Sequence, residues 1–432
     1  MSAITDTDLD DLLVVEEAEF AAARVHRRRR VAVAFLIGAF LLTRAFSGYV
    51  ADHPGFFGSN VADGTGDVHY YDGLTWDMRH ENQDPYGPYM RMEYPPGAIP
   101  VMMVPRYVRI VSYRTEFIAM MVLFDALGLL ALLRIGQRTG SWWGAATWFV
   151  LVPALGVVSY TRLDLVVAVL FVWTMERALA GRWEWVGLLI GVGAAVKLVP
   201  ALLLPLLFCI APRDRRKALV GWFATVVGIA IVPWIDRLPD LFDSVITYHT
   251  ERGIQAESVW GAGVLVARWV ANYPVSIVSS HRAWDAQADV SEFLKTMSTV
   301  AAILVLVVGV ILAIRTRPGD VPRATLLVFG VMSLMVGVGK VYSPQYIVWL
   351  IALGAVAMAV IPRRAAPAIV TLAIVTLLGN LLFPLWFWDL LFYDKGGALI
   401  ALAVRNALTI VTGLLAWWAW RGLARDPAAS RA

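Results

Sequence analysis

Long apolar runs follow one another along most of this 432-residue chain, with short basic clusters between them. Hydrophobic residues make up 59% of the chain and charged residues only 16%, whereas a soluble domain carries about 25% charged residues. So few charges cannot cover the surface of a soluble fold of this length. The continuous runs also differ from the roughly ten-residue alternating segments of a membrane β-barrel. The pattern predicts an all-α, polytopic integral membrane protein.

The net charge of +4 comes largely from the clusters between apolar runs, which is the pattern of cytoplasmic loops rather than of a nucleic-acid surface. Cys209 is the only cysteine, so no disulfide framework or cysteine-based metal site is expected. The aspartates at 6–11 are interpreted as part of a solvated tail, not as a DxD metal site. No spacing of His, Asp and Glu is specific for a metal. We therefore expect neither a metal nor a cofactor, and no nucleic-acid partner.

Apolar runs of sufficient length predict about twelve transmembrane helices. In chain order they cover residues 31–46, 116–133, 142–160, 163–177, 184–196, 198–211, 217–234, 297–314, 323–339, 345–361, 366–386 and 397–420. With the arginines at 24–30 inside, alternation places the strong basic clusters on the cytoplasmic side. A transmembrane domain over 31–420 then lies in the plasma membrane between two cytoplasmic tails, 1–30 and 421–432. The acidic start of the chain does not resemble a cleavable signal peptide.

Two segments interrupt this regular pattern. The first outer loop, 47–111, contains the apolar stretch 96–111, which prolines and arginines break and which predicts an interfacial or re-entrant helix. The run 184–211 has Lys197 near its middle. Two half-helices that meet at Lys197 preserve the charge asymmetry. Because irregular backbone at membrane depth is tolerated only beside protein or a wet cavity, Lys197 is predicted to face a cavity.

Isolated ionisable residues gather at the outer ends of the predicted spans, where such groups are costly and mark a functional cavity. The candidate substrate-binding residues are Glu93, Tyr94, Arg162, Asp164, Lys197, His249, Arg252, Glu257, Lys340 and Gln345, and the candidate catalytic residue is Asp67. Structural alternatives remain for several of them. Arg162 and Asp164 could form an ion pair at a helix start, and Lys197 could extend along the membrane to reach water.

A cavity with several cations and a few carboxylates suits an anionic lipid substrate. Sugar transfer from a lipid phosphate requires a carboxylate that accepts the proton of the attacking hydroxyl and cations that stabilise the leaving phosphate. Broken helices with central charges also occur in transporters, so a flippase for a lipid-linked sugar is an alternative. A non-catalytic assembly scaffold is a third. The charges gather on one face and no inverted repeat is evident, which argues against the transporter.

Six motifs in a fixed order resemble the family 87 glycosyltransferases of actinobacteria, within the GT-C superfamily. After an aspartate in the first outer loop, they are Asp-Pro-Tyr at 84–86, Glu-Tyr-Pro-Pro-Gly at 93–97, Arg-Leu-Asp at 162–164, the run 194–205, the segment 249–258 and the segment 340–346. The resemblance covers about residues 31–420 and implies a role in cell-envelope biosynthesis.

The resemblance implies polyprenyl-phosphate-sugar donors, lipid or glycan acceptors, an outer active site, inversion at the anomeric carbon and no required metal. It also implies that the first-loop aspartate is the general base. Asp67 is the expected residue, and Asp63 and Asp72 are the alternatives. Mannose is the expected sugar and arabinofuranose the alternative, because the family includes transferases of both.

Overall fold

The computed structural model describes residues 34, 36–53, 56, 62, 64, 66–211 and 215–425. The chain forms two compact units, residues 1–47 and 48–432. Of the first unit, residues 34 and 36–47 are helical. The predicted tail 1–30 and Asp63 lie outside the described residues, as do residues 426–432 of the predicted C-terminal tail. All elements named from here on belong to the second unit.

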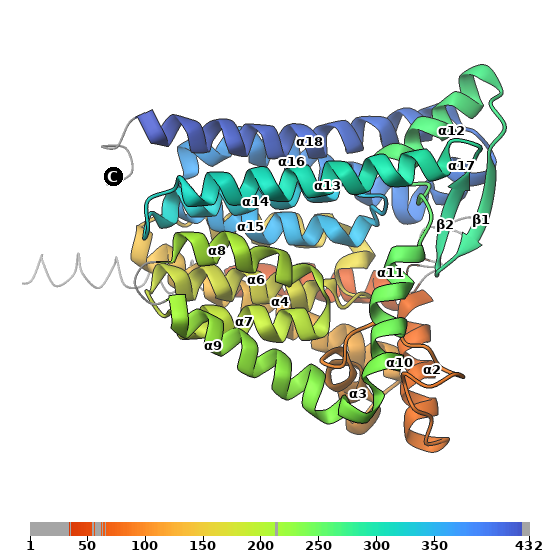
Figure 1. Ribbon diagram of the computed structural model, residues 1–432, viewed down its shortest axis with the longest axis horizontal. Coiled ribbons are helices and arrows are strands. Elements are labelled where there is room, and N and C mark those ends of the chain that lie inside the picture. Colours follow the sequence, from red (N-terminus) through yellow and green to blue (C-terminus); the bar gives the residue numbers. More distant parts are fainter. Residues whose placement is uncertain are drawn as a thin grey trace, which may run out of the picture. The chain divides into compact units, whose positions relative to one another are not determined.

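The second unit consists mainly of helices (Figure 1). The α-helices are α2 (Gly66–His80), α3 (Ala98–Val108), α4 (Tyr113–Thr139), α5 (Trp143–Ala154), α6 (Asp164–Leu179), α7 (Trp183–Val196), α8 (Leu203–Ile210), α9 (Arg215–Val226), α10 (Leu238–Phe242), α11 (Tyr248–Glu251), α12 (Val259–Ala271), α13 (Ser291–Ile314), α14 (Val321–Val338), α15 (Ile347–Val360), α16 (Pro362–Asn380), α17 (Phe387–Phe392) and α18 (Gly396–Arg425). Short 3₁₀ or π turns are η2 (Gly156–Ser159), η3 (Val199–Leu202), η4 (Val227–Ile231), η5 (Val232–Arg237), η6 (Asp243–Thr247), η7 (Pro344–Tyr346) and η8 (Leu381–Leu385).

Within the described ranges, six helical segments are long and apolar enough to cross a membrane. They are Tyr113–Thr139, Arg215–Glu251, Ser291–Ile314, Val321–Val338, Pro362–Leu385 and Gly396–Leu423. Shorter apolar helices such as α5 and α7 stand between them. The prediction of a helical, multi-pass membrane protein is confirmed. The count of about twelve spans stays a prediction, because the shorter helices do not reach the length of a full span alone.

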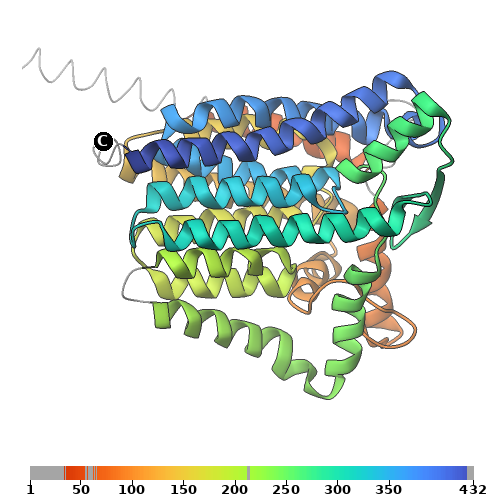
Figure 2. The same cartoon turned by 45° about the horizontal axis from the view of Figure 1, so that its top comes forward.

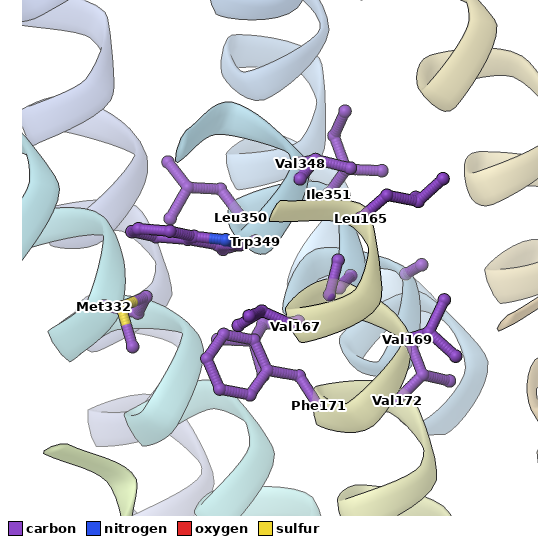
Figure 3. Close-up of a cluster of buried hydrophobic side chains, with 14 of the residues drawn as sticks. Leu165, Val167, Val169, Phe171, Val172, Met332, Val348, Trp349, Leu350 and Ile351 are labelled. Atoms are coloured by element: carbon purple, nitrogen blue, oxygen red, sulfur yellow. The ribbon is translucent and has the colours of Figure 1, made fainter. Parts of the chain in front are cut away.

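The centre of the bundle is formed by α6 and α15, whose residues are buried almost throughout. Figure 3 shows Leu165, Val167 and Phe171 of α6 beside Val348 and Ile351 of α15. A helix that is apolar on every side is stable only where neighbours surround it. The apolar sequences of both helices therefore account for their central positions.

The run 184–211 is broken, as the sequence predicts. Helix α7 ends at Val196, and Lys197 has an extended backbone with φ −155° and ψ 137°. The chain then resumes helical structure in η3 and α8. Gly97, just before α3, packs against this break: a Cβ at Gly97 would lie 2.7 Å from the carbonyl oxygen of Ala195. Only a glycine permits this close approach, which fixes the segment 93–97 beside Lys197.

A small β-hairpin, absent from the sequence prediction, adds to the helical fold. Strands β1 (Ser276–Ser280) and β2 (Ala283–Gln287) are antiparallel. His281 and Arg282 form the two-residue turn with φ of 47° and 56°, as in a type I′ hairpin. The segment 254–256 bonds to β2 through Ala256 N to Trp284 O, 2.8 Å, and Ala286 N to Ile254 O, 2.9 Å. Figures 1 and 2 both show the hairpin at the end of the bundle where α2 and α11 lie.

Candidate active site

A cavity of about 350 Å³ lies at this end of the bundle. Nine of the eleven predicted site residues line it: Asp67, Glu93, Tyr94, Arg162, Lys197, His249, Arg252, Glu257 and Gln345. They come from α2, from the segment before α3, from the breaks before α6 and after α7, from α11 and the loop that follows it, and from η7. Helix packing thus brings together residues that lie far apart in the sequence. Asp164 and Lys340 do not line the cavity.

Asp67 lies in the first turn of α2, where the helix dipole favours a carboxylate. Its Oδ2 lies 2.8 Å from Nε of Arg162, which precedes α6 by two residues. The same guanidinium donates through NH1 to the carbonyl oxygen of Gly64, at 3.1 Å. Arg162 therefore holds the chain just before α2 as well as the carboxylate of Asp67. The alternative Asp72 lies outside the cavity lining and forms an ion pair with Arg106.

Lys197 and Asp164 form a second buried ion pair. Nζ of Lys197 donates to both carboxylate oxygens of Asp164, at 2.8 and 3.0 Å. The side chain of Asp164 is only 3% exposed and that of Lys197 16%. The rings of Tyr346 and Trp349 lie 5.2 and 5.3 Å from the ammonium group. The structure thus pairs Arg162 with Asp67 and Asp164 with Lys197, in place of the Arg162–Asp164 pair considered from sequence.

Glu93 is the second carboxylate at the cavity wall. Tyr70 OH donates to its Oε2 at 2.5 Å, and Nε of Arg282 lies 4.0 Å from Oε1. Burial raises the pKa of Glu93 above its usual range, against the opposing effects of Tyr70 and Arg282. The adjacent Tyr94 lies 3.2 Å from Tyr71, hydroxyl to hydroxyl. The motif at 93–97 therefore presents a carboxyl and a phenol to the same cavity.

Glu257 is the third carboxylate of the cavity. Gln255 Nε2 donates to its Oε2 at 3.2 Å, and NH1 of Arg405 lies 3.6 Å from Oε1. Arg405 and Asn406 also donate to the backbone carbonyl of Glu257, at 2.6 and 3.2 Å. Burial raises the pKa of Glu257 to about 7, although the positive charge of Arg405 lowers it in part. Gln255 and Arg405 thus hold the carboxyl group of Glu257 in one position.

The remaining cations differ in their partners. Arg252 lines the cavity, and among the described residues no carboxylate lies within ion-pair distance of it; its guanidinium lies 6.0 Å from the ring of Tyr248. Lys340 instead donates to the backbone carbonyls of Thr250 and Arg252, both at 2.9 Å. Burial and the nearby charges of Lys295 and Arg252 lower the pKa of Lys340 to about 8. Lys340 therefore supports the loop that carries Arg252.

An apolar groove of about 330 Å³ adjoins the polar cavity. The two share Lys197, His249 and Tyr346. Beyond these residues the groove wall is largely aliphatic and thioether: Leu198, Val199, Leu202, Met332, Met335, Val336 and Val341. Figure 3 shows Met332 of α14 beside Trp349, which also lines the groove. A charged cavity thus continues directly into an apolar surface.

The comparisons with known proteins give the family. A sequence profile of glycosyltransferase family 87 matches residues 93–344. The chain belongs to glycosyltransferase family 87. It is also similar to the crystal structure of ArnT from Cupriavidus metallidurans bound to undecaprenyl phosphate, with a TM-score of 0.48 and 17% identity over 91% of this chain and 78% of that chain. Among curated proteins, no significant match is found.

The family 87 profile covers only part of the cavity. It includes the sequence around Glu93, Arg162, Lys197, Arg252 and Glu257. Asp67, on α2, lies before the matched region. Phe383, Phe387 and Trp388, which also line the cavity, lie after it. Residues before and after the matched region therefore also line the cavity of this family 87 protein.

Sequence reasoning missed several residues of the site. Arg282 and Trp284 belong to the unpredicted hairpin, and Trp388 belongs to α17, which lies between the predicted spans 366–386 and 397–420. For Arg405 a signal existed: a lone arginine lies inside the apolar run 397–420, and such charges mark functional interiors. The described residues contain no group of three or more His, Cys, Asp or Glu side chains placed to hold a metal ion.

Proposed function

We propose that this family 87 protein transfers a sugar, mannose in the first instance, from a polyprenyl-phosphate donor to a lipid or glycan acceptor at the outer face of the plasma membrane. One observation carries the proposal: a carboxylate held by an arginine and further cations line a cavity that shares Lys197, His249 and Tyr346 with an adjoining apolar groove. The carboxylate, the cations and the groove are each required for sugar transfer from a lipid phosphate. Family membership favours this chemistry over transport or scaffolding.

Asp67 is the proposed general base. In the reaction the acceptor hydroxyl attacks the anomeric carbon and gives its proton to the carboxylate. The bond between the anomeric carbon and the phosphate oxygen breaks, so the electron pair leaves with polyprenyl phosphate. Attack from the side opposite the phosphate inverts the anomeric centre. Arg162 holds Asp67 at 2.8 Å, and a positioned base of this kind accelerates such steps about 10²–10⁴-fold.

Arg252 is the proposed principal ligand of the donor phosphate. Arg162 and Lys197 already bind carboxylates, and Lys340 binds backbone carbonyls. Of these four cations, Arg252 is the one that has no carboxylate partner in the described part of the chain. A guanidinium binds phosphate oxygens through two parallel hydrogen bonds. Lys197, where the cavity meets the groove, contributes a second positive charge.

The polyprenyl chain occupies the apolar groove in this proposal. The groove begins at Lys197 and His249, so the phosphate and the first isoprene units lie on either side of these two residues. The outer location follows from charge asymmetry. Arg138, Arg177, Arg315 and Arg421 lie near the ends of α4, α6, α13 and α18, at the opposite end of the bundle from the hairpin (Figure 1). Basic residues of this kind favour the cytoplasmic side.

Transfer by membranes that contain the protein tests the proposal. Membranes are supplied with radiolabelled polyprenyl-phosphate mannose, and labelled glycolipids are separated by chromatography. Asp67→Asn should reduce transfer at least 100-fold, whereas Asp77→Asn on the same helix should leave it unchanged. Transfer by the Asp67→Asn protein at the wild-type rate would refute the assignment of the base. Labelled polyprenyl-phosphate arabinofuranose in a parallel assay identifies the sugar.

A further inference from the structure

An aromatic surface that the proposed chemistry does not use lines one side of the cavity. It consists of Trp284 of β2, Phe383 of η8, and Phe387 and Trp388 of α17. The rings touch in sequence: the centroids of Trp284 and Trp388 lie 6.0 Å apart, those of Trp388 and Phe387 5.2 Å, and those of Phe387 and Phe383 5.1 Å. We call these four residues the aromatic wall.

Contacts on the side away from the cavity hold the aromatic wall in place. Phe392 packs edge-on against Trp284 at 5.3 Å and stacks on Trp388 at 5.9 Å. The backbone of Trp284 is fixed by the hydrogen bond from Ala256 N to its carbonyl oxygen. Both tryptophans are only half-buried, and both line the cavity. The wall thus keeps aromatic surface available to whatever enters the cavity.

Glu257 is the polar neighbour of the aromatic wall. It follows Ala256, whose amide pairs with the backbone of Trp284. Its side chain is 5% exposed, and Gln255 and Arg405 fix the carboxyl group. Each carboxylate oxygen accepts up to two hydrogen bonds, so Oε2 retains capacity beyond the bond from Gln255. The aromatic wall and a carboxyl group that accepts hydrogen bonds therefore line the same cavity.

This combination selects one class of ligand. A phosphodiester anion and a hydrocarbon chain both lack a hydrogen-bond donor for the remaining acceptor capacity of the Glu257 carboxyl. A sugar ring has a face of C–H groups that packs on an aromatic ring and a rim of hydroxyls that donate to a carboxylate. Pockets that recognise such ligands combine aromatic walls with a few placed polar groups.

We propose that the aromatic wall and Glu257 form the subsite that binds a sugar ring in this enzyme. The inference rests on the proposed function for the supply of that sugar, which comes either from the donor or from the end of the acceptor. Three of the four wall residues lie outside the region 93–344 that matches the family profile. The subsite therefore adds to the charged part of the cavity.

Binding measurements on the purified protein in detergent test this inference without turnover. The variants are Trp388→Leu, which removes the ring, and Trp388→Phe, which keeps one; Trp284→Leu repeats the removal from a different element. Trp418→Leu is the matched control, because Trp418 is 65% exposed on α18. The probes are polyprenyl-phosphate mannose, polyprenyl phosphate without a sugar, and octyl α-mannoside as a mimic of an acceptor.

If the wall holds the donor sugar, Trp388→Leu weakens binding of polyprenyl-phosphate mannose about three- to tenfold and leaves that of polyprenyl phosphate unchanged. If it holds the acceptor sugar, only binding of octyl α-mannoside weakens. Trp388→Phe restores binding in either case. Unchanged binding of both sugar probes, or an equal loss for polyprenyl phosphate, overturns the inference. Absence of transfer by the wild-type protein would refute the proposed function alone, because binding that depends on the sugar is measured separately.

Discussion

Oδ2 of Asp67 and Nε of Arg162 lie 2.8 Å apart, and NH1 of the same arginine bonds to the carbonyl oxygen of Gly64. One guanidinium thus fixes both the proposed base and the chain that leads into its helix. This makes Arg162 a positioning residue for Asp67. It also leaves Arg162 less available to bind the donor phosphate, a role that the sequence equally suggests.

The first prediction concerns Arg162. Arg162→Gln should lower kcat about 100-fold, the cost typical of a misplaced catalytic group, with a small change in the KM for the donor. Arg162→Lys keeps the positive charge but loses the planar, forked arrangement of guanidinium donors. Its kcat should therefore lie between those of the wild type and Arg162→Gln. Steady-state kinetics with labelled donor separate the two parameters. A rise in KM at constant kcat would instead assign Arg162 to the phosphate.

The second prediction concerns the buried pair of Lys197 and Asp164. Removal of one partner leaves an uncompensated charge, which costs about 3–5 kcal/mol. Lys197→Met and Asp164→Leu should each lower the thermal midpoint in detergent markedly. The double variant should recover much of that loss but remain inactive, because Lys197 also faces the cavity. Additive destabilisation in the double variant would show that the two residues are not energetically coupled.

The third prediction concerns pH and Glu257. Its folded-state pKa is raised to about 7, so between about pH 4.5 and 7 the folded protein retains a proton that the unfolded chain releases. Stability should therefore fall as the pH rises through this window, and less so in Glu257→Gln. Thermal midpoints between pH 5 and 8 measure the slope. Glu292→Gln, at a side chain that is 88% exposed, serves as the control, and identical slopes for wild type and Glu257→Gln would contradict the prediction.

The fourth prediction concerns Gly97. A Cβ there meets the backbone of Ala195 at 2.7 Å, so Gly97→Ala should destabilise the protein by about 1–3 kcal/mol through overpacking. It should also reduce transfer, because Glu93 and Tyr94 move away from Lys197. Gly73→Ala is the matched control: a Cβ at Gly73, on α2, meets nothing within 4 Å. Equal stability of the two variants would show that the contact at Ala195 is adaptable.

Helix positions were predictable because apolar runs and basic clusters report membrane burial directly. The break at Lys197 was predictable for the same reason, since a lysine inside an apolar run needs a cavity. The hairpin was not predictable: its strands carry no long alternating pattern, and β2 also bonds to the segment 254–256, which the sequence does not reveal. Helix α12 was also missed, because its 13 residues are too short for a span.

The residues that line the cavity were more predictable from the sequence than the ion pairs and hydrogen bonds between them. Charge at what the sequence predicts to be the outer ends of spans pointed to Asp67, Arg162 and Lys197, which the structure brings to one cavity. The sequence could not show that Asp164 binds Lys197 or that Lys340 binds carbonyls, because these contacts depend on how distant helices pack. The aromatic wall was hidden for a similar reason, since aromatic residues at membrane interfaces are common anchors.

The charges around the cavity also bear on product release. Four ion pairs join Asp67 to Arg162, Asp164 to Lys197, Glu93 to Arg282 and Glu257 to Arg405. Each of these four cations is offset by a carboxylate, although Glu257 is only partly ionised near pH 7, so the cavity keeps a positive excess that includes Arg252. The proposed donor is a phosphodiester, which carries one negative charge. The carrier lipid that leaves is a phosphomonoester, which carries about 1.5–2 negative charges. The outgoing lipid is thus attracted more strongly by the positive charge of the cavity than the incoming one, so product inhibition by polyprenyl phosphate should weaken as rising ionic strength screens that attraction.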